Sequence, residues 1–260
     1  MNIKSARPLV SVVIPHYGGI EIISQCIESL YNCKYPNIEL IVLDNNSPDN
    51  SHEFIKINFP NVKLLQSEYN RGFAGGCNMA IKYTKGEYIL ILNNDTTHDP
   101  KWIDYLVEFM ESNPFVSSVQ PKIKNYYKKN YFDYAGACGG YIDKYCFPFA
   151  RGRIFSTVEE DNGQYDSKNR IFWASGTAFL TRKTIFQKMG GFDEVLFAHM
   201  EEIDYHWKCQ SIGCEVWVEP KSIVYHKGAT TLPTSSPKKT YLNYRNSLIL
   251  LLTNYSISNT

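Results

Sequence analysis

Short apolar runs alternate with helical patterns from residue 9 to residue 114, and this alternation restricts the fold more than any other feature of the sequence. The apolar runs are rich in β-branched residues, as buried strands are, and lie at 9–15, 38–47, 62–68 and 87–95. Helices are expected between and after them, at 19–33, 51–59, 74–86 and 100–114. Such alternation predicts right-handed crossovers and an α/β fold: a doubly wound, mainly parallel, Rossmann-like sheet with helices on both faces.

The second half of the chain is less regular. Residues 120–170 have no clear period and predict strands joined by long loops. After them we expect a strand and a helix over 172–192, a helix over 199–213, a pair of strands over 215–228, and an amphipathic helix with an irregular end over 241–260. We see no repeat, linker or low-complexity tract.

Composition and charge exclude several classes of protein. The net charge of +1 leaves no basic excess for neutralising phosphates, so we expect no nucleic-acid partner. No apolar stretch approaches the ~20 residues of a membrane helix, and the N-terminus predicts a strand and not a secretion signal. The seven cysteines form no CxxC pair, which is typical of reduced thiols in a cytoplasmic protein.

Polar side chains stand where the predicted strands end, and in open sheets of this kind ligands bind beyond the carboxyl ends of the strands. Asn93, Asn94 and Asp95 follow the fourth strand. Asp95 offers one hard oxygen ligand for Mg²⁺ or Mn²⁺, and an asparagine could add a neutral carbonyl, while diphosphate oxygens and waters complete the coordination. An Asx turn before the next helix would explain the same residues.

Two further stretches lie at the same edge. Asp44, after the second strand, could accept hydrogen bonds from a base or ribose, and Tyr17, after the first, could stack on a ring; a turn or N-cap explains Asp44 equally well. The glycine-rich "NRGFAGGCN" (70–78) lets the backbone approach an anion at a helix N-terminus, although a tight helix start has the same pattern.

Acidic residues open the helix predicted at 199–213. Glu201, Glu202 and Asp204 could supply a general base whose pKa is raised by crowding, or they could simply favour the first turn through the helix dipole. His226 follows the apolar stretch "SIVY" and could be a metal ligand, although a lone histidine is more often structural.

The order of these motifs is more specific than any one of them. "VSVVIPHY", "IELIVLDNNSPDNS", "NRGFAGGCNMAI", "GEYILILNNDT", "SGTAFLTRKTIFQKMGGFDE", "HMEEIDYHWKCQSIG" and "VYHKG" together resemble family 2 glycosyltransferases, and most of all the bacterial rhamnosyltransferase-like group. The resemblance covers about residues 8–228 and implies a GT-A fold with an acceptor-side extension. It implies a nucleotide-sugar-binding half, residues 1–118, and an acceptor-binding and catalytic half, residues 119–260.

The resemblance also implies roles for single residues. "NND" replaces the family's DxD motif, with Asn93 in the place of the first aspartate and Asn94 in the middle, so Asp95 would hold the divalent metal with His226 as a further ligand. The nucleoside pocket would be lined by Pro15, Tyr17, Asp44, Asn70, Arg71 and Gly72.

On the acceptor side, the family's Glu-Asp pair falls on Glu201 and Glu202, and Glu202 would be the base although a glutamate stands where the family has aspartate. Asp204 would support the base. Trp173 and Gly176 would lie beside the acceptor.

These roles imply an inverting, metal-dependent glycosyltransferase. It would take a nucleoside-diphosphate sugar, dTDP-rhamnose or a UDP-hexose, and extend a glycan or lipid-linked acceptor of a surface polysaccharide.

The C-terminal helix could then support peripheral association with the inner face of the plasma membrane, although a helix packed in the core would have the same sequence pattern. A nucleotidyltransferase would want a basic loop near the first strand, which "PHYGGIE" lacks. A nucleotide-sugar- or carbohydrate-binding module with impaired catalysis is the alternative.

Overall fold

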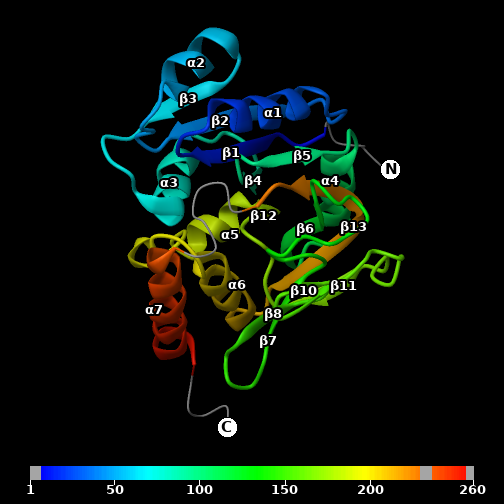
Figure 1. Ribbon diagram of the computed structural model, residues 1–260. Helices are drawn as coiled ribbons and strands as arrows, with labels where there is room; N and C mark the ends of the chain where they lie inside the picture. Colours follow the sequence, from blue (N-terminus) through cyan, green and yellow to red (C-terminus); the bar gives the residue numbers. More distant parts are fainter. Residues whose placement is uncertain (1–6, 229–235, 256–260) are drawn as a thin grey trace.

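The computed structural model describes residues 7–228 and 236–255, and its first half alternates strands with helices as the sequence predicts (Figure 1). The elements are β1 (Val10–His16), α1 (Ile20–Tyr31), β2 (Ile38–Asp44), α2 (Ser51–Asn58), β3 (Lys63–Gln66), α3 (Gly72–Ile81), β4 (Tyr88–Leu92), β5 (Thr96–His98) and α4 (Trp102–Ser112). The helix expected at 74–86 is shorter at its C-terminal end. Gly86 does not end it but lies beside β1, where a Cβ would be 2.6 Å from the carbonyl oxygen of Leu9.

The second half adds the remaining strands and helices of the described chain. They are β6 (Val116–Asn125), β7 (Gly140–Ile142), β8 (Pro148–Ala150), β9 (Arg153–Ile154), β10 (Thr157–Val158), β11 (Asn169–Ile171), β12 (Ala178–Arg182), α5 (Lys183–Lys188), the 3₁₀ helix η1 (Glu194–Leu196), α6 (Glu201–Ser211), β13 (Glu215–His226) and α7 (Pro237–Asn254).

The prediction of a pair of strands over 215–228 is wrong: β13 is one strand, with a shift in register between Glu219 and Ile223. Pro220 lies at this shift and has no N–H for the ladder.

A central sheet joins both halves in the order β11-β13-β6-β12-β4-β1-β2-β3, with β5 paired to β13. The strands β3, β2, β1 and β4 are mutually parallel, and so are β6 and β13. β12 runs antiparallel between β4 and β6. The doubly wound α/β fold is therefore confirmed, with parallel pairing in the first half and mixed pairing in the second.

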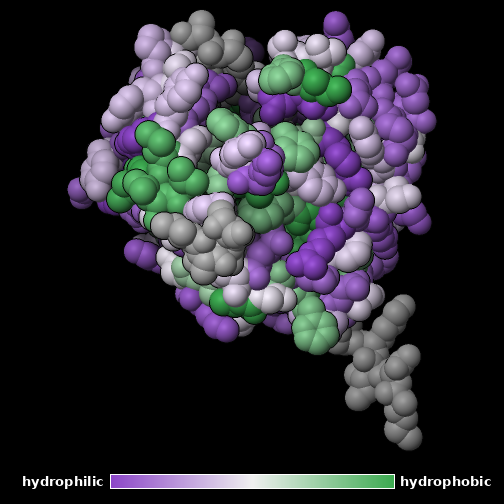
Figure 2. Space-filling model, turned by 90° about the horizontal axis from the view of Figure 1, so that it is seen from below, coloured by the Kyte–Doolittle hydropathy of each residue, from purple (hydrophilic) through white to green (hydrophobic). Residues whose placement is uncertain are grey.

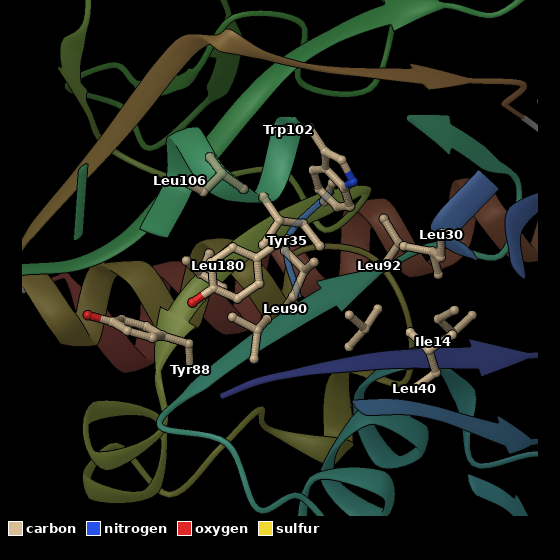
Figure 3. Packing of buried hydrophobic residues seen from close by; sticks show 14 of the residues in the cluster. Ile14, Leu30, Tyr35, Leu40, Tyr88, Leu90, Leu92, Trp102, Leu106 and Leu180 are labelled. Carbon is tan, nitrogen blue, oxygen red and sulfur yellow. The ribbon is translucent and has the colours of Figure 1, made fainter. Parts of the chain in front are cut away.

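Helices cover both faces of the sheet because alternate strand residues point to opposite sides. On one face Ile14, Leu90 and Leu180 pack with Leu30 of α1 and with α4, whose Trp102 and Leu106 are fully buried (Figure 3). On the other face Val13, Ile91 and Phe179 pack with α3, α5 and α6.

The last helix, α7, lies beside α6 (Figure 1). It buries Leu242, Asn246 and Leu250. The irregular end expected after it falls mainly on residues 256–260, outside the described residues. Within residues 7–228 and 236–255, no helix combines the length and hydrophobicity needed to cross a bilayer.

A tight contact between Gly140 and Trp173 allows a test of the packing in the second half. A Cβ at position 140 would overlap the indole, so Gly140→Ala should lower the free energy of unfolding by about 1–3 kcal/mol in a urea titration. Gly176→Ala is the control, because the nearest atoms to its Cβ would be 3.6 Å away. Equal midpoints for the two variants would contradict this interpretation of the contact.

Candidate active site

The carboxyl ends of β1, β2 and β4 meet at one edge of the sheet. His16 and Asp44 are register partners there, and Asn94 Nδ2 lies 2.8 Å from His16 Nδ1. Burial lowers the pKa of His16 to about 4, so the neutral ring accepts a hydrogen bond from the amide. Asn94 therefore ties the end of β4 to the end of β1, and its expected part in donor binding stays a prediction.

Asn45 holds the loop that precedes α3. Its Oδ1 accepts a hydrogen bond from Arg71 N (2.8 Å), and its Nδ2 donates to the carbonyl oxygen of Gly72 (2.8 Å) and to Asn70 Oδ1 (3.2 Å). These contacts place Asn70, Arg71 and Gly72 beside Asn45, the neighbour of Asp44, and their part in a nucleoside pocket stays a prediction. Sequence analysis did not single out Asn45, and its position directly after Asp44 was the available signal.

Asp44 is buried, with 1% of its surface exposed, and forms the turn that was the alternative explanation for it. Its Oδ1 accepts a hydrogen bond from Ser47 N (3.0 Å), while Oδ2 lies 3.5 Å from His52 Nδ1. Pro15 is half-buried and Tyr17 is 38% exposed at the same edge. The turn and a contact with a ligand are compatible, because the turn uses only one carboxylate oxygen.

Asp95 and His226 come together from opposite halves of the chain. His226 Nε2 is 3.1 Å from Asp95 Oδ1, and His226 Nδ1 is 3.0 Å from Asp133 Oδ2. The pairing of β5 with β13 places Thr96 opposite His226 and so fixes this meeting. Burial alone would lower the pKa of His226, but the charges of Asp95 and Asp133 and hydrogen bonds to both carboxylates raise it to about 10.

This donor set fits a divalent cation. Metal-binding histidines usually give their second ring nitrogen to a carboxylate, and Asp133 occupies that position on His226. Among the described residues there is no cluster of three or more His, Cys, Asp or Glu side chains suited to a metal. The protein would therefore supply Asp95 and His226, and diphosphate oxygens and waters would supply the rest, as is common for Mg²⁺. Asp133 was not foreseen because no motif surrounds it.

Glu201 and Glu202 open α6 beside Gly176. Burial raises the pKa of both carboxyls, and the charge of Glu202 raises that of Glu201 further. Gly176 N donates to Glu202 Oε1 across a long 3.5 Å. The residue after Gly176 is Thr177, whose carbonyl oxygen accepts a hydrogen bond from Asn93 N (2.9 Å). Glu202 therefore lies near the "NND" segment, although the two are far apart in the sequence.

Two other expected site residues are engaged in packing. Asp204 accepts hydrogen bonds from Lys208 Nζ (2.6 Å) and Asn254 Nδ2 (2.8 Å), so it ties α6 to α7. Trp173 is 7% exposed, and its Nε1 donates to the carbonyl oxygen of Tyr141 (2.9 Å). The structure gives both residues structural contacts, and their catalytic and acceptor-side roles stay predictions.

Comparisons with known proteins bear on the whole fold. The Escherichia coli glucosyltransferase WfgD, described as acting with UDP-Glc on α-D-GlcNAc-diphosphoundecaprenol, is 34% identical over 45% of this chain and 46% of its own length. The N-acetylglucosaminyl-diphospho-decaprenol L-rhamnosyltransferase of Mycobacterium tuberculosis is 24% identical over 75% of this chain and 68% of its own. The crystal structure of GalNAc-T7 with UDP, GalNAc and Mn²⁺ has a TM-score of 0.74 at 17% identity, over 94% of this chain and 48% of that one.

The chain spans between 36% and 62% of the length of the first curated relatives that it matches. The structural likeness confirms the expected GT-A fold. The family model described as "Glycosyl transferase family 2" matches residues 11–190, which is more than half of the sequence. The chain therefore belongs to glycosyl transferase family 2.

Proposed function

We propose that the chain is an inverting glycosyltransferase that moves a sugar from dTDP-rhamnose or a UDP-hexose to a glycan or lipid-linked acceptor of a surface polysaccharide. The observation that carries the proposal is the contact of Asp95 with His226 (3.1 Å) at the carboxyl edge of the sheet. Glu202 lies close to this edge, because Asn93 N binds the Thr177 carbonyl (2.9 Å) and the adjacent Gly176 N contacts Glu202 (3.5 Å). Residues 1–118 would form the donor side and residues 119–260 the acceptor side. Relatives described as acting on diphosphopolyprenol-linked sugars support the acceptor class.

The donor side follows from the hydrogen bonds around β2. Asp44 would accept hydrogen bonds from the nucleoside, and Tyr17, which is partly exposed beside it, would stack on a ring. The loop of Asn70, Arg71 and Gly72, held by Asn45, would close the pocket.

The chemistry at the anomeric carbon needs a base on one side and charge stabilisation on the other. Asp95 and His226 would hold Mg²⁺ or Mn²⁺, which stabilises negative charge on the departing diphosphate. Glu202 would take the proton from the acceptor hydroxyl, and one displacement inverts the configuration. Because burial raises the pKa of Glu202, its base form is lost at a higher pH than for an ordinary glutamate.

The first test measures release of the nucleoside diphosphate from a panel of UDP-, dTDP- and GDP-sugars, with Mn²⁺ and with EDTA. Turnover of one donor is expected with Mn²⁺ only. The rate should fall about 10²-fold or more in Asp95→Ala, which removes charge stabilisation, and in Glu202→Gln, which removes the base. Asp143→Asn, a carboxylate in the exposed turn between β7 and β8, is the control. Nucleotide binding without turnover of any donor or acceptor would favour a binding module instead.

The metal site has a test that does not depend on turnover. Asp133→Asn should weaken Mn²⁺ affinity by about 10–100-fold, because the carboxylate behind His226 orients the ring and raises its basicity. Isothermal titration with Mn²⁺ in the presence of UDP measures this, and Asp143→Asn again serves as the control. If Asp133→Asn bound Mn²⁺ as tightly as wild type, His226 could not be a ligand oriented by Asp133.

The outer face of α7 supports peripheral membrane association. Five exposed large side chains lie within an arc of about 100° at 3.6 residues per turn: Tyr241, Tyr244, Leu248, Leu251 and Leu252. Figure 2 shows hydrophobic residues gathered on the side where Figure 1 places α7. The helix sequence has three basic residues, of which Arg245 binds inward to Val195 and Leu196, and no acidic one, so its net charge suits an anionic bilayer surface.

Vesicle sedimentation tests this surface. Wild type should bind vesicles containing phosphatidylglycerol more than purely zwitterionic vesicles, and Leu248→Glu with Leu252→Glu should abolish the binding, because two charges would enter the apolar interface. Ile57→Glu, at an exposed aliphatic residue of α2, is the matched control. If the double variant instead turned a dimer into a monomer in analytical ultracentrifugation, a second copy of the chain would cover α7 and the membrane proposal would fall.

A further inference from the structure

The segment between η1 and α6 holds a strained backbone directly before Glu202. Phe197, His199 and Met200 have φ angles of 63°, 69° and 75°, values that residues other than glycine rarely adopt. At Phe197 the chain makes a tight turn, with Ala198 N 2.7 Å from the carbonyl oxygen of Leu196. Such conformations persist only where the surroundings hold them.

The side chain of Asn246, on α7, stabilises this strained segment. It is fully buried, and its Nδ2 lies 2.9 Å from the carbonyl oxygen of Leu196, 2.9 Å from that of Ala198 and 2.6 Å from that of His199. Three carbonyls share the two N–H groups of one amide. The orientation of this segment is therefore fixed by a helix that is more than 30 residues away in the sequence.

The neighbouring Arg245 completes the contact. Its Nε donates to Asn246 Oδ1 (2.9 Å), which orients the amide. Its Nη2 donates to the carbonyl oxygens of Val195 (2.7 Å) and Leu196 (3.0 Å). The carbonyl of Phe197 accepts a hydrogen bond from Ala74 N (3.1 Å) at the start of α3, and that of Met200 accepts one from Asp204 N (2.9 Å) within α6.

The held segment determines where α6 begins. Met200 follows His199 and is the N-cap of α6, and Glu202 is the second residue of that helix. A shift of the carbonyls at 196–199 would move Glu202 relative to Gly176, whose N–H lies 3.5 Å from Glu202 Oε1. Misplacing a reacting group by about 1 Å can lower a rate by about 10²-fold.

We propose that Asn246 is a positioning residue for sugar transfer: by binding the carbonyls of residues 196, 198 and 199 it sets the location of Glu202 against the acceptor. Asn246 does not touch the substrates and acts through the backbone of the strained segment. The inference rests on the proposed role of Glu202 as the base.

The experiment compares Asn246→Ala, Asn246→Asp and the control Asn243→Ala, using the donor identified by the panel above. Asn246→Asp keeps the size of the side chain but directs oxygens at three carbonyl oxygens. Asn243 lies on the same helix, is half-buried, and its side chain makes no hydrogen bond with any residue that the structure describes. Steady-state kcat and donor KM are measured, together with UDP affinity by titration and the melting temperature.

Both Asn246 variants should lower kcat by about 10²-fold. Donor KM and UDP affinity should change far less, because the segment reaches the donor side only through Phe197, next to Gly72 and Ala74, and Asn246 does not bind the Phe197 carbonyl. Asn243→Ala should behave as wild type. A loss of stability alone would not separate kcat from KM in this way. Wild-type kcat in a folded Asn246→Ala protein would overturn the inference.

Arg245→Gln decides the case if the Asn246 variants fail to fold. It removes hydrogen bonds to two carbonyls of the same region from a half-buried site and should also lower kcat far more than it changes donor KM. Unchanged kcat in this variant would overturn the inference. Full turnover in Glu202→Gln would show instead that the proposed base is wrong, and the inference would fall with it.

Discussion

The antiparallel hydrogen bonds of β12 hold the two halves of the chain in one sheet. β12 pairs with β4 along Ala178–Arg182 and with β6 at Leu180 and Thr181. Beyond β6 lies β13, so this pairing sets the distance between the end of β4 and the end of β13. Asp95 and His226 meet because β5, which follows Asp95 after β4, spans this distance and pairs with the end of β13. Glu202 contacts Gly176, which leads into β12.

Arg182 reinforces the same junction from the end of β12. Its guanidinium donates to the carbonyl oxygens of Met110 (2.7 Å) and Asn113 (3.2 Å) at the end of α4, and its Nε donates to that of Val116 (2.9 Å) at the start of β6. A cation near the last carbonyls of a helix is favourable for the helix dipole. The central strand, one covering helix and the next strand are therefore joined by one side chain.

The proposed site combines two arrangements that are poor choices for stability alone. Asp95, Asp133 and His226 are at most 5% exposed, and desolvating such charges offsets much of their mutual attraction. In the segment before α6, Phe197, His199 and Met200 each cost on the order of 1–3 kcal/mol in backbone strain. Strongly shifted pKa values and strained backbone concentrate at functional sites, which agrees with the location derived from the fold.

The two faces of α7 make different contacts. The inner face carries Asn246 and, through Asn254, a contact with Asp204 of α6. The outer face carries the apolar stripe proposed to meet a membrane. A ligand on the outer face would thus be one helix diameter from the segment that precedes Glu202, so the lipid surface and the proposed base would be linked through a single rigid element.

The sequence by itself determined the alternating strands and helices of the first half, because hydrophobic period and turn residues are local signals. It also determined the family, because the order of motifs from "VSVVIPHY" to "VYHKG" is specific even where "NND" departs from the usual pattern. Asp44 and Gly176 were proposed as site residues in this way, and their roles stay predictions.

Only the tertiary structure decided the contacts made across the chain. Three side chains make contacts that no local sequence pattern predicts, because each binds residues at least 25 positions away. They are Asp133, which binds His226, Asn45, which binds the glycine-rich loop, and Asn246, which binds the segment before α6. The antiparallel direction of β12 and the single long strand β13 were likewise hidden, because the pairing of strands depends on how the chain returns to the sheet and not on the period within each strand. Local free energies select the elements, whereas the burial of their shared surfaces selects their neighbours.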